Sequence, residues 1–393
     1  MCEVRGISSS YTHVETADGT VFDLVASRDA DGTVRCSLVA SRVHGVSGSG
    51  WRTMIDRDWE PSEVVVGANS TVYLFLASLT EFTLDGRNSR RLLVVGPEGI
   101  RADVATIWNL EKAPSGTLYM LSEDVQPNGI DARSRSLAAL GPDGLPQAGW
   151  PYTVDGYISW PTFGEDGAAY VAQSTSAGWA LVALTPTGTV KAGWPYAVPG
   201  GPPVGAPRIA PDGSLYGAFA DGIYVVRPDG GAKPGWPYLM PSGTHREVAV
   251  RGGLGAQEFE PTMTEDGRIY LPVARDSGTV AKDDVLCLRS DGTSCPGWPV
   301  RLPEGWAIWE MAIDAQGVVQ LALLAWGRSE PIRDSYTRVS IRPDGTLFHR
   351  VEAGDTVSGL ADAYGVTQAA LLAANPQVTD PSRVPVGDVL FIP

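Results

Sequence analysis

Short apolar runs alternate with small polar turns along most of the chain. Runs such as "ALVALTPTG" from Ala180 and "GIYVVRPDG" from Gly222 end in a glycine turn. A second turn precedes each run, as in "PSGTLY" from Pro114 and "PDGSLY" from Pro211. Tight hairpins need residues that tolerate positive φ, and Asp-Gly and Ser-Gly pairs supply them. The pattern therefore predicts many short antiparallel strands joined by hairpins.

The turns recur at a nearly constant interval. Equivalent turn positions are 19, 70, 116, 167, 213, 267 and 317, which lie 46 to 54 residues apart. Four short antiparallel strands repeated at this period are typical of a propeller blade. The predicted fold is mostly β, a seven-bladed β-propeller of four-stranded antiparallel blades over residues 1–347. Its units lie near 10–60, 61–109, 110–157, 158–203, 204–254, 255–304 and 305–347.

A tryptophan stands six residues after the second turn glycine of several units. It belongs to a Gly-Trp-Pro motif at Trp150, Trp194, Trp236 and Trp298, with a degenerate copy at Trp51. We expect the indoles to pack between neighbouring blades and the glycines to permit close approach. Stacking of the same indoles on sugar rings is the alternative.

The seventh unit has no such tryptophan, because Val351 stands at the expected place. We hypothesise that an extra strand over residues 2–9 completes this unit and closes the ring. The units resemble the quinoprotein-type and related β-propeller repeats that end in Gly-Trp-Pro. That resemblance covers residues 1–347 and implies a fold rather than an activity, since propellers host unrelated functions.

The repeating pattern of apolar runs and glycine turns ends after Gly345. A short strand at "HRV" from His349, two helices and a closing strand at "DVLFIP" from Asp388 predict a βααβ domain over 348–393. Either Thr356 or Ser358 is expected to cap the first helix and Thr367 the second. Gly365 is expected to end the first helix.

This segment is similar to the LysM domain. The matching residues are Val351, Gly354, Asp355, Thr356, Leu360, Ala361, Tyr364, Gly365, Val366, Leu371, Asn375, Pro376, Val384, Val386, Gly387, Leu390, Ile392 and Pro393. The resemblance implies binding of N-acetylglucosamine chains, as in peptidoglycan or chitin, in a groove between two loops. Carried over by motif, the carbohydrate-binding residues are Gly354, Asp355, Thr356, Val357, Ser358, Asn375, Pro376, Gln377 and Val378.

Two points qualify the carried-over groove. Gly354, Asp355 and Asn375 also suit a purely structural role as turn and cap residues. His349 stands where the family usually carries an aromatic residue. We expect that exchange to weaken packing without touching the sugar groove.

Net charge, apolar run length and cysteine positions limit the class of partner and the structural options of the protein. The formal net charge of −15 argues against nucleic acid, which needs a basic face. No apolar run reaches about 18 residues, so no membrane span is expected, and no signal peptide is recognisable. Cys287 and Cys295 flank a turn, so either a bridge or ordinary thiols fit the pattern.

The sequence shows little catalytic chemistry. The four histidines form no metal or hydrolase motif, and single carboxylates at the turns do not supply a calcium loop's oxygens. We expect no catalytic residue, no metal and no cofactor.

The sequence therefore favours a non-catalytic binding protein. Its LysM domain would hold peptidoglycan or another N-acetylglucosamine polymer, and the propeller would offer a platform for a protein or a glycan. The alternative is a structural tail or baseplate component of a phage or contractile injection particle. The expected location is the bacterial cell envelope or exterior if a signal peptide was omitted, and otherwise a virion or injection particle.

Overall fold

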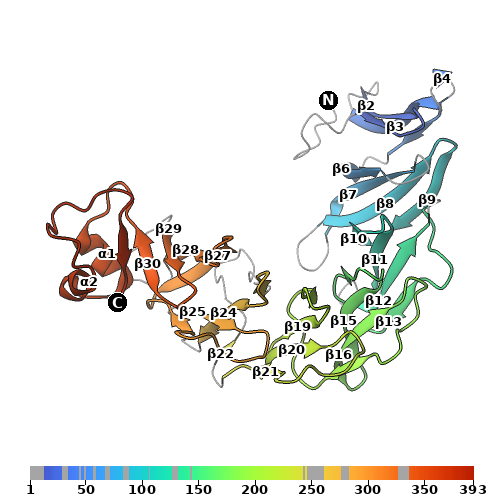
Figure 1. Cartoon of the computed structure of the whole chain (residues 1–393). Coiled ribbons are helices and arrows are strands. Elements are labelled where there is room, and N and C mark those ends of the chain that lie inside the picture. The colour runs from blue at the N-terminus through green and yellow to red at the C-terminus, as the bar shows by residue number, and fades with distance from the viewer. Residues whose placement is uncertain are drawn as a thin grey trace. The chain divides into compact units, whose positions relative to one another are not determined.

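A computed structural model of the 393-residue chain gives the fold (Figure 1). The chain forms two compact units, Met1–Ser176 with Val182–Lys191, and Ala177–Leu181 with Ala192–Pro393. The structure describes residues 13–28, 34–43, 46–47, 50–55, 59–66, 71–82, 88–105, 107–125, 132–141, 144–241, 244–245, 261–275, 283–325 and 336–393.

Seven antiparallel sheets of four or five strands follow one another along the described residues, which is the number of blades predicted. The first sheet contains β1 (His13–Glu15), β2 (Val21–Arg28), β3 (Val34–Val43), β4 (Val46–Ser47) and β5 (Arg52–Met54). The second contains β6 (Trp59–Val66), β7 (Val72–Phe82), β8 (Asn88–Gly96) and β9 (Gly99–Ala105). The third contains β10 (Ile107–Lys112), β11 (Leu118–Val125), β12 (Ala132–Leu140) and β13 (Tyr152–Val154).

The remaining sheets repeat this plan. The fourth contains β14 (Thr162–Phe163), β15 (Ala169–Thr175), β16 (Gly178–Leu184) and β17 (Tyr196–Val198). The fifth contains β18 (Arg208–Ile209), β19 (Leu215–Phe219), β20 (Gly222–Val226) and β21 (Tyr238–Leu239). The sixth contains β22 (Thr244–His245), β23 (Thr262–Met263), β24 (Ile269–Arg275), β25 (Asp283–Leu288) and β26 (Val300–Arg301). The seventh contains β27 (Trp306–Ile313), β28 (Val319–Ala325), β29 (Tyr336–Ile341), β30 (Leu347–Arg350) and β31 (Val389–Phe391).

The tryptophans of the repeat are packing residues, as predicted. The four indoles of the Gly-Trp-Pro motifs are nearly buried. Three of them lie edge-on to a tyrosine of their own sheet, in the pairs Tyr119–Trp150, Tyr216–Trp236 and Tyr270–Trp298, at centroid distances of 5.5, 5.5 and 5.3 Å. Four indoles donate hydrogen bonds to backbone carbonyls in the next repeat: Trp51 to Pro97 (2.8 Å), Trp150 to Pro186 (3.0 Å), Trp236 to Ser290 (3.2 Å) and Trp298 to Pro343 (3.1 Å). At exposures of 7–8% for Trp150, Trp194, Trp236 and Trp298, these rings are not available to stack on a sugar.

The motif glycines permit the predicted close approach between successive sheets. Gly345 has φ +86°, and a Cβ built on it would lie 2.3 Å from the carbonyl oxygen of Gly297. Since Gly297 belongs to the Gly-Trp-Pro motif of the sixth sheet, backbone meets backbone directly at this contact. Any side chain at position 345 would force the two sheets apart.

The seventh sheet is continuous with the C-terminal domain. Its strand order is β27-β28-β29-β30-β31, so β30 is both its fourth strand and the first strand of the βααβ segment. Residues 2–9, which we expected to complete this sheet, lie outside the described residues. One apolar core runs from Val339 and Ile341 of the sheet to Leu360, Tyr364 and Leu371 of the helices. The C-terminal domain therefore shares both hydrogen bonds and core with the last sheet.

Cys287 and Cys295 form a disulfide bond across the hairpin that joins β25 to the Gly-Trp-Pro segment. The sequence left open whether these two cysteines are bridged or are ordinary thiols, and in the structure they are bridged. In the described part of the chain, no helix has the length and apolar character that a membrane crossing would require.

Candidate functional site

Two short helices carry the loops of the C-terminal domain. Helix α1 (Val357–Tyr364) begins after Thr356, whose hydroxyl accepts a hydrogen bond from the Gly359 amide at 3.0 Å. It ends at Gly365, which is left-handed at φ +66°. Helix α2 (Gln368–Ala374) is capped by Thr367 in the same way. Of the two caps considered for α1, the structure uses Thr356, and the predicted end of that helix is confirmed.

The first predicted loop is open to solvent. Gly354, Thr356 and Ser358 are exposed, whereas Val357 is buried in the core of the domain. Gly354 has φ +98° and nothing within 4 Å of its Cβ position, so a ligand can approach its backbone. The loop thus presents backbone and small hydroxyl groups.

Asp355 shapes this loop from within. Its carboxylate accepts a hydrogen bond from the Glu352 amide at 2.6 Å, closing a turn around Gly354. The Asp355 side chain retains 25% of its exposure, so it faces both the loop interior and solvent.

The second predicted loop is organised by Asn375, which is only 1% exposed. The Asn375 amide uses both of its ends. Its Nδ2 donates to the carbonyls of Leu371 and Phe391, each at 2.7 Å, and its Oδ1 accepts from the Phe391 amide at 2.8 Å and from Gln377 Nε2 at 3.0 Å. The Asn375 side chain is therefore committed to holding the loop, and Pro376 and Gln377 are the exposed residues beside it. Val378 is half-buried.

A chain of contacts ties the second loop to the start of the first. Gln377 Nε2 donates to the carbonyl of Val389 at 3.2 Å, and Val389 pairs with Arg350 across β30 and β31. The next residue, Val351, donates its amide to the carbonyl of Asp388 at 2.8 Å. Both loops consequently emerge beside the same two-stranded ladder.

The exposed groups suit a neutral polar polymer. Hydroxyl, amide and backbone groups can hydrogen-bond to acetamido and hydroxyl groups, while Pro376 and Val378 offer small apolar surfaces. Across the described ranges, no group of three or more His, Cys, Asp or Glu residues is placed to hold a metal ion.

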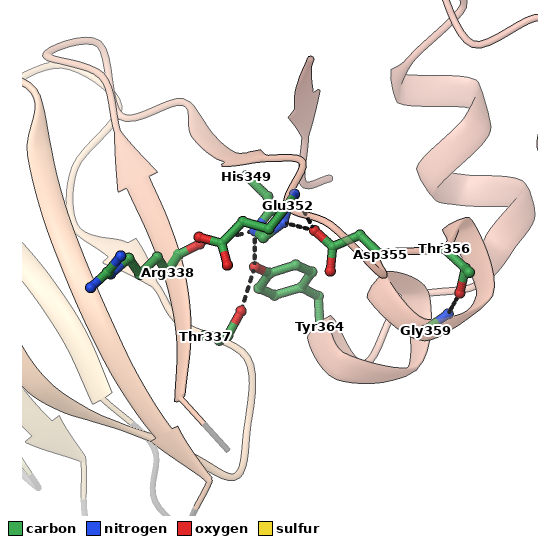
Figure 2. A network of polar contacts seen from close by, with 8 residues as sticks. All are labelled: Thr337, Arg338, His349, Glu352, Asp355, Thr356, Gly359 and Tyr364. Carbon is green, nitrogen blue, oxygen red and sulfur yellow. Dashed lines mark hydrogen bonds and ion pairs between the residues drawn. The ribbon is translucent and has the colours of Figure 1, made fainter. Parts of the chain in front are cut away.

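The sequence did not predict the polar network behind the first loop, shown in Figure 2. His349 is 3% exposed, and its Nε2 lies 2.8 Å from Asp355 Oδ2. Its Nδ1 lies 2.9 Å from the Arg338 carbonyl and 2.8 Å from the Tyr364 hydroxyl. The His349 ring thus contacts Asp355, a residue predicted for the groove, whereas the sequence led us to expect an effect on packing alone. The signal in the sequence was the histidine at position 349, where the family usually carries an aromatic residue. That exchange alone does not reveal the polar partners of the ring.

The network joins the C-terminal domain to the seventh sheet. The Tyr364 hydroxyl lies 3.2 Å from Thr337 Oγ1 of β29, and burial raises the pKa of Tyr364 well above its usual range. The phenol therefore keeps its proton and remains a hydrogen-bond donor. Nearby, the indole of Trp306 donates to the Ala363 carbonyl at the end of α1 at 2.5 Å.

Comparison with known proteins identifies the C-terminal domain. Residues 349–393 match the LysM domain family, so the chain carries a LysM domain there. A search of curated proteins finds no match to the chain.

The seven sheets are similar to solved structures of low identity. Puromycin hydrolase is 15% identical over 84% of this chain, with a TM-score of 0.39, and the match takes up 51% of that protein, about half its length. Streptogramin B lyase is 15% identical, with 80% of this chain and 91% of that chain covered and a TM-score of 0.33. A eukaryotic initiation factor is 9% identical, with 85% of each chain covered and a TM-score of 0.38. Identities and scores at this level carry no information on activity.

Proposed function

We propose that this protein is a non-catalytic glycan-binding protein whose LysM domain binds N-acetylglucosamine-containing chains, with peptidoglycan as the natural ligand. The observation that carries the proposal is the LysM match at 349–393 together with two exposed loops at one end of a shared strand ladder. Asp355 and Asn375 hold these loops, and Gly354, Ser358 and Gln377 supply exposed groups.

The charge of the protein supports recognition by hydrogen bonds. With a net charge of −15 the chain gains nothing from long-range attraction to an anionic polymer. Binding would therefore depend on short-range contacts to acetamido and hydroxyl groups, and it would change little with ionic strength.

The seven sheets are proposed as a platform that the LysM domain attaches to the wall. A protein or a second glycan is the expected partner of that platform. The shared β30 supports a rigid attachment, because there is no linker between the last sheet and the domain.

The proposed location is the bacterial cell envelope or the extracellular space. A LysM domain and the Cys287–Cys295 disulfide both suit that setting, since disulfides persist in oxidising compartments.

Co-sedimentation of the full chain with insoluble peptidoglycan tests the proposal. We expect the wild type to pellet, and a soluble N-acetylglucosamine oligomer to release it. A Ser358→Ala, Gln377→Ala double variant should weaken binding about tenfold, since two hydrogen bonds of about 0.5–1.5 kcal/mol each are removed.

The matched control is Gln368→Ala, which makes the same change at an exposed position on α2. It should bind as the wild type does. A wild type that stays in the supernatant would contradict the proposal and would favour the LysM domain as a docking module of a particle.

A further inference from the structure

We propose that His349 is a positioning residue for glycan binding: through contacts at both of its ring nitrogens, it fixes the first LysM loop to the last sheet. This inference rests on the proposed function for its binding readout alone. The contacts that carry it belong to the protein itself (Figure 2).

The two ring nitrogens of His349 reach acceptors on opposite sides of the ring. The Arg338 carbonyl lies 2.9 Å from Nδ1, and the Asp355 carboxylate lies 2.8 Å from Nε2. Carbonyl and carboxylate oxygens accept hydrogen bonds, so a ring N–H is the group that meets them. The ring therefore bridges β29 and the LysM loop through direct polar contacts.

Tyr364 adds a second link from the ring to β29, because its hydroxyl lies 2.8 Å from Nδ1 and 3.2 Å from Thr337 Oγ1. Leu390, the strand partner of His349 on β31, is apolar. Around the ring, the charged or titratable groups are Asp355 and Glu352 from the loop, Tyr364 from α1 and Arg338 from β29, whose side chain is exposed.

The contact to Asp355 is the step that reaches the glycan loop. The Asp355 carboxylate is held by two donors, His349 Nε2 and the Glu352 amide. Asp355 lies in the chain between Gly354 and Thr356, the residue that caps α1. Removing the His349 donor leaves one anchor on a carboxylate that is a quarter exposed, which frees the loop to adopt other conformations.

The contact to Arg338 is the step that reaches the sheet. Arg338 belongs to β29, the third strand of the seventh sheet, whereas Asp355 belongs to the LysM loop. His349 lies on β30 between them. The geometry of the glycan loop is therefore set by the sheet as well as by the LysM fold, so the domain in this chain is not an independent module.

Two substitutions of the full chain separate positioning from packing. His349→Phe keeps an aromatic ring, as the LysM family usually has here, and removes both ring nitrogens. His349→Gln keeps a donor near the place of Nε2 and loses the contact to Arg338. Ile341→Val is the matched control, because it trims the buried core of the same sheet without touching the network.

Affinity for a soluble N-acetylglucosamine hexamer is measured by calorimetry. We expect His349→Phe to weaken binding about tenfold, His349→Gln to stay within about threefold of wild type, and Ile341→Val to bind normally. A His349→Phe variant that binds as the wild type, or a His349→Gln variant as weak as His349→Phe, overturns the positioning role.

One readout needs no glycan and so remains decisive if the proposed function fails. Amide exchange at Glu352 and Asp355 should quicken in His349→Phe but not in Ile341→Val, and equal protection in all three proteins overturns the inference. A wild type that binds no hexamer, together with the expected exchange result, contradicts the proposed function alone.

Discussion

Replacing Asn375 with alanine should disable glycan binding by unfolding a loop rather than by removing a contact. The Asn375 side chain is 1% exposed and makes four hydrogen bonds, three of them to backbone groups of Leu371 and Phe391. Alanine leaves those three backbone groups without their partner in a site that water reaches poorly.

The expected loss follows from that count. An abandoned buried hydrogen-bond partner costs about 1–3 kcal/mol, so three such backbone groups imply a loss of at least about 3 kcal/mol in the free energy of unfolding. Asn375→Asp has nearly the same shape, yet it turns a carboxylate oxygen toward two carbonyls. Its loss should equal or exceed that of alanine, because it also buries a charge.

Denaturant unfolding of the full chain, followed by a spectroscopic probe of the C-terminal domain, measures these losses. Gln377→Ala is the control, since Gln377 is exposed and touches the same Asn375 oxygen. It should lower stability by less than about 1 kcal/mol. An Asn375→Ala protein as stable as the wild type, with binding nevertheless lost, would refute the reasoning and make Asn375 a direct glycan contact.

Two further predictions concern the sheets. Replacing both Cys287 and Cys295 with alanine should lower the free energy of unfolding by about 2–3 kcal/mol, because the bridge closes a loop of sequence separation 8; denaturant unfolding under oxidising conditions tests this, and equal midpoints contradict it. Gly345→Ala should lower the melting temperature far more than Gly354→Ala. Both glycines have positive φ, but the added Cβ meets the Gly297 carbonyl at 2.3 Å in the first case and open space in the second. Equal shifts in the two variants would show that the close approach of the sheets contributes nothing.

Local sequence signals predicted most of the fold because each acts within a few residues. The Asp-Gly turns and the apolar runs between them specify hairpins, and Thr356, Gly365 and Thr367 stand at the predicted helix ends. The recurring tryptophan indicated packing because it stands at the same position in successive repeats, where the same contact between neighbouring sheets is expected to recur. Its hydrogen bond to the next repeat agrees with that interpretation.

The features that the sequence did not predict depend on contacts between distant segments. β30 belongs both to the seventh sheet and to the LysM domain, because β31, some forty residues later, pairs along its free edge. Asn375 was placed among the ligand contacts because a buried, fully bonded amide and an exposed one look the same in sequence. His349 bonds to Arg338 on one side and Asp355 on the other, and no local pattern encodes that bridge.

The central claim is that the two LysM loops bind N-acetylglucosamine chains. Its most direct test is an NMR titration of the ¹⁵N-labelled full chain with the soluble hexamer. The account predicts saturable shifts at the amides of Gly354, Ser358 and Gln377, with small shifts at exposed Gln368. No shift at these loops at saturating hexamer, or shifts confined to the seven sheets, would contradict it.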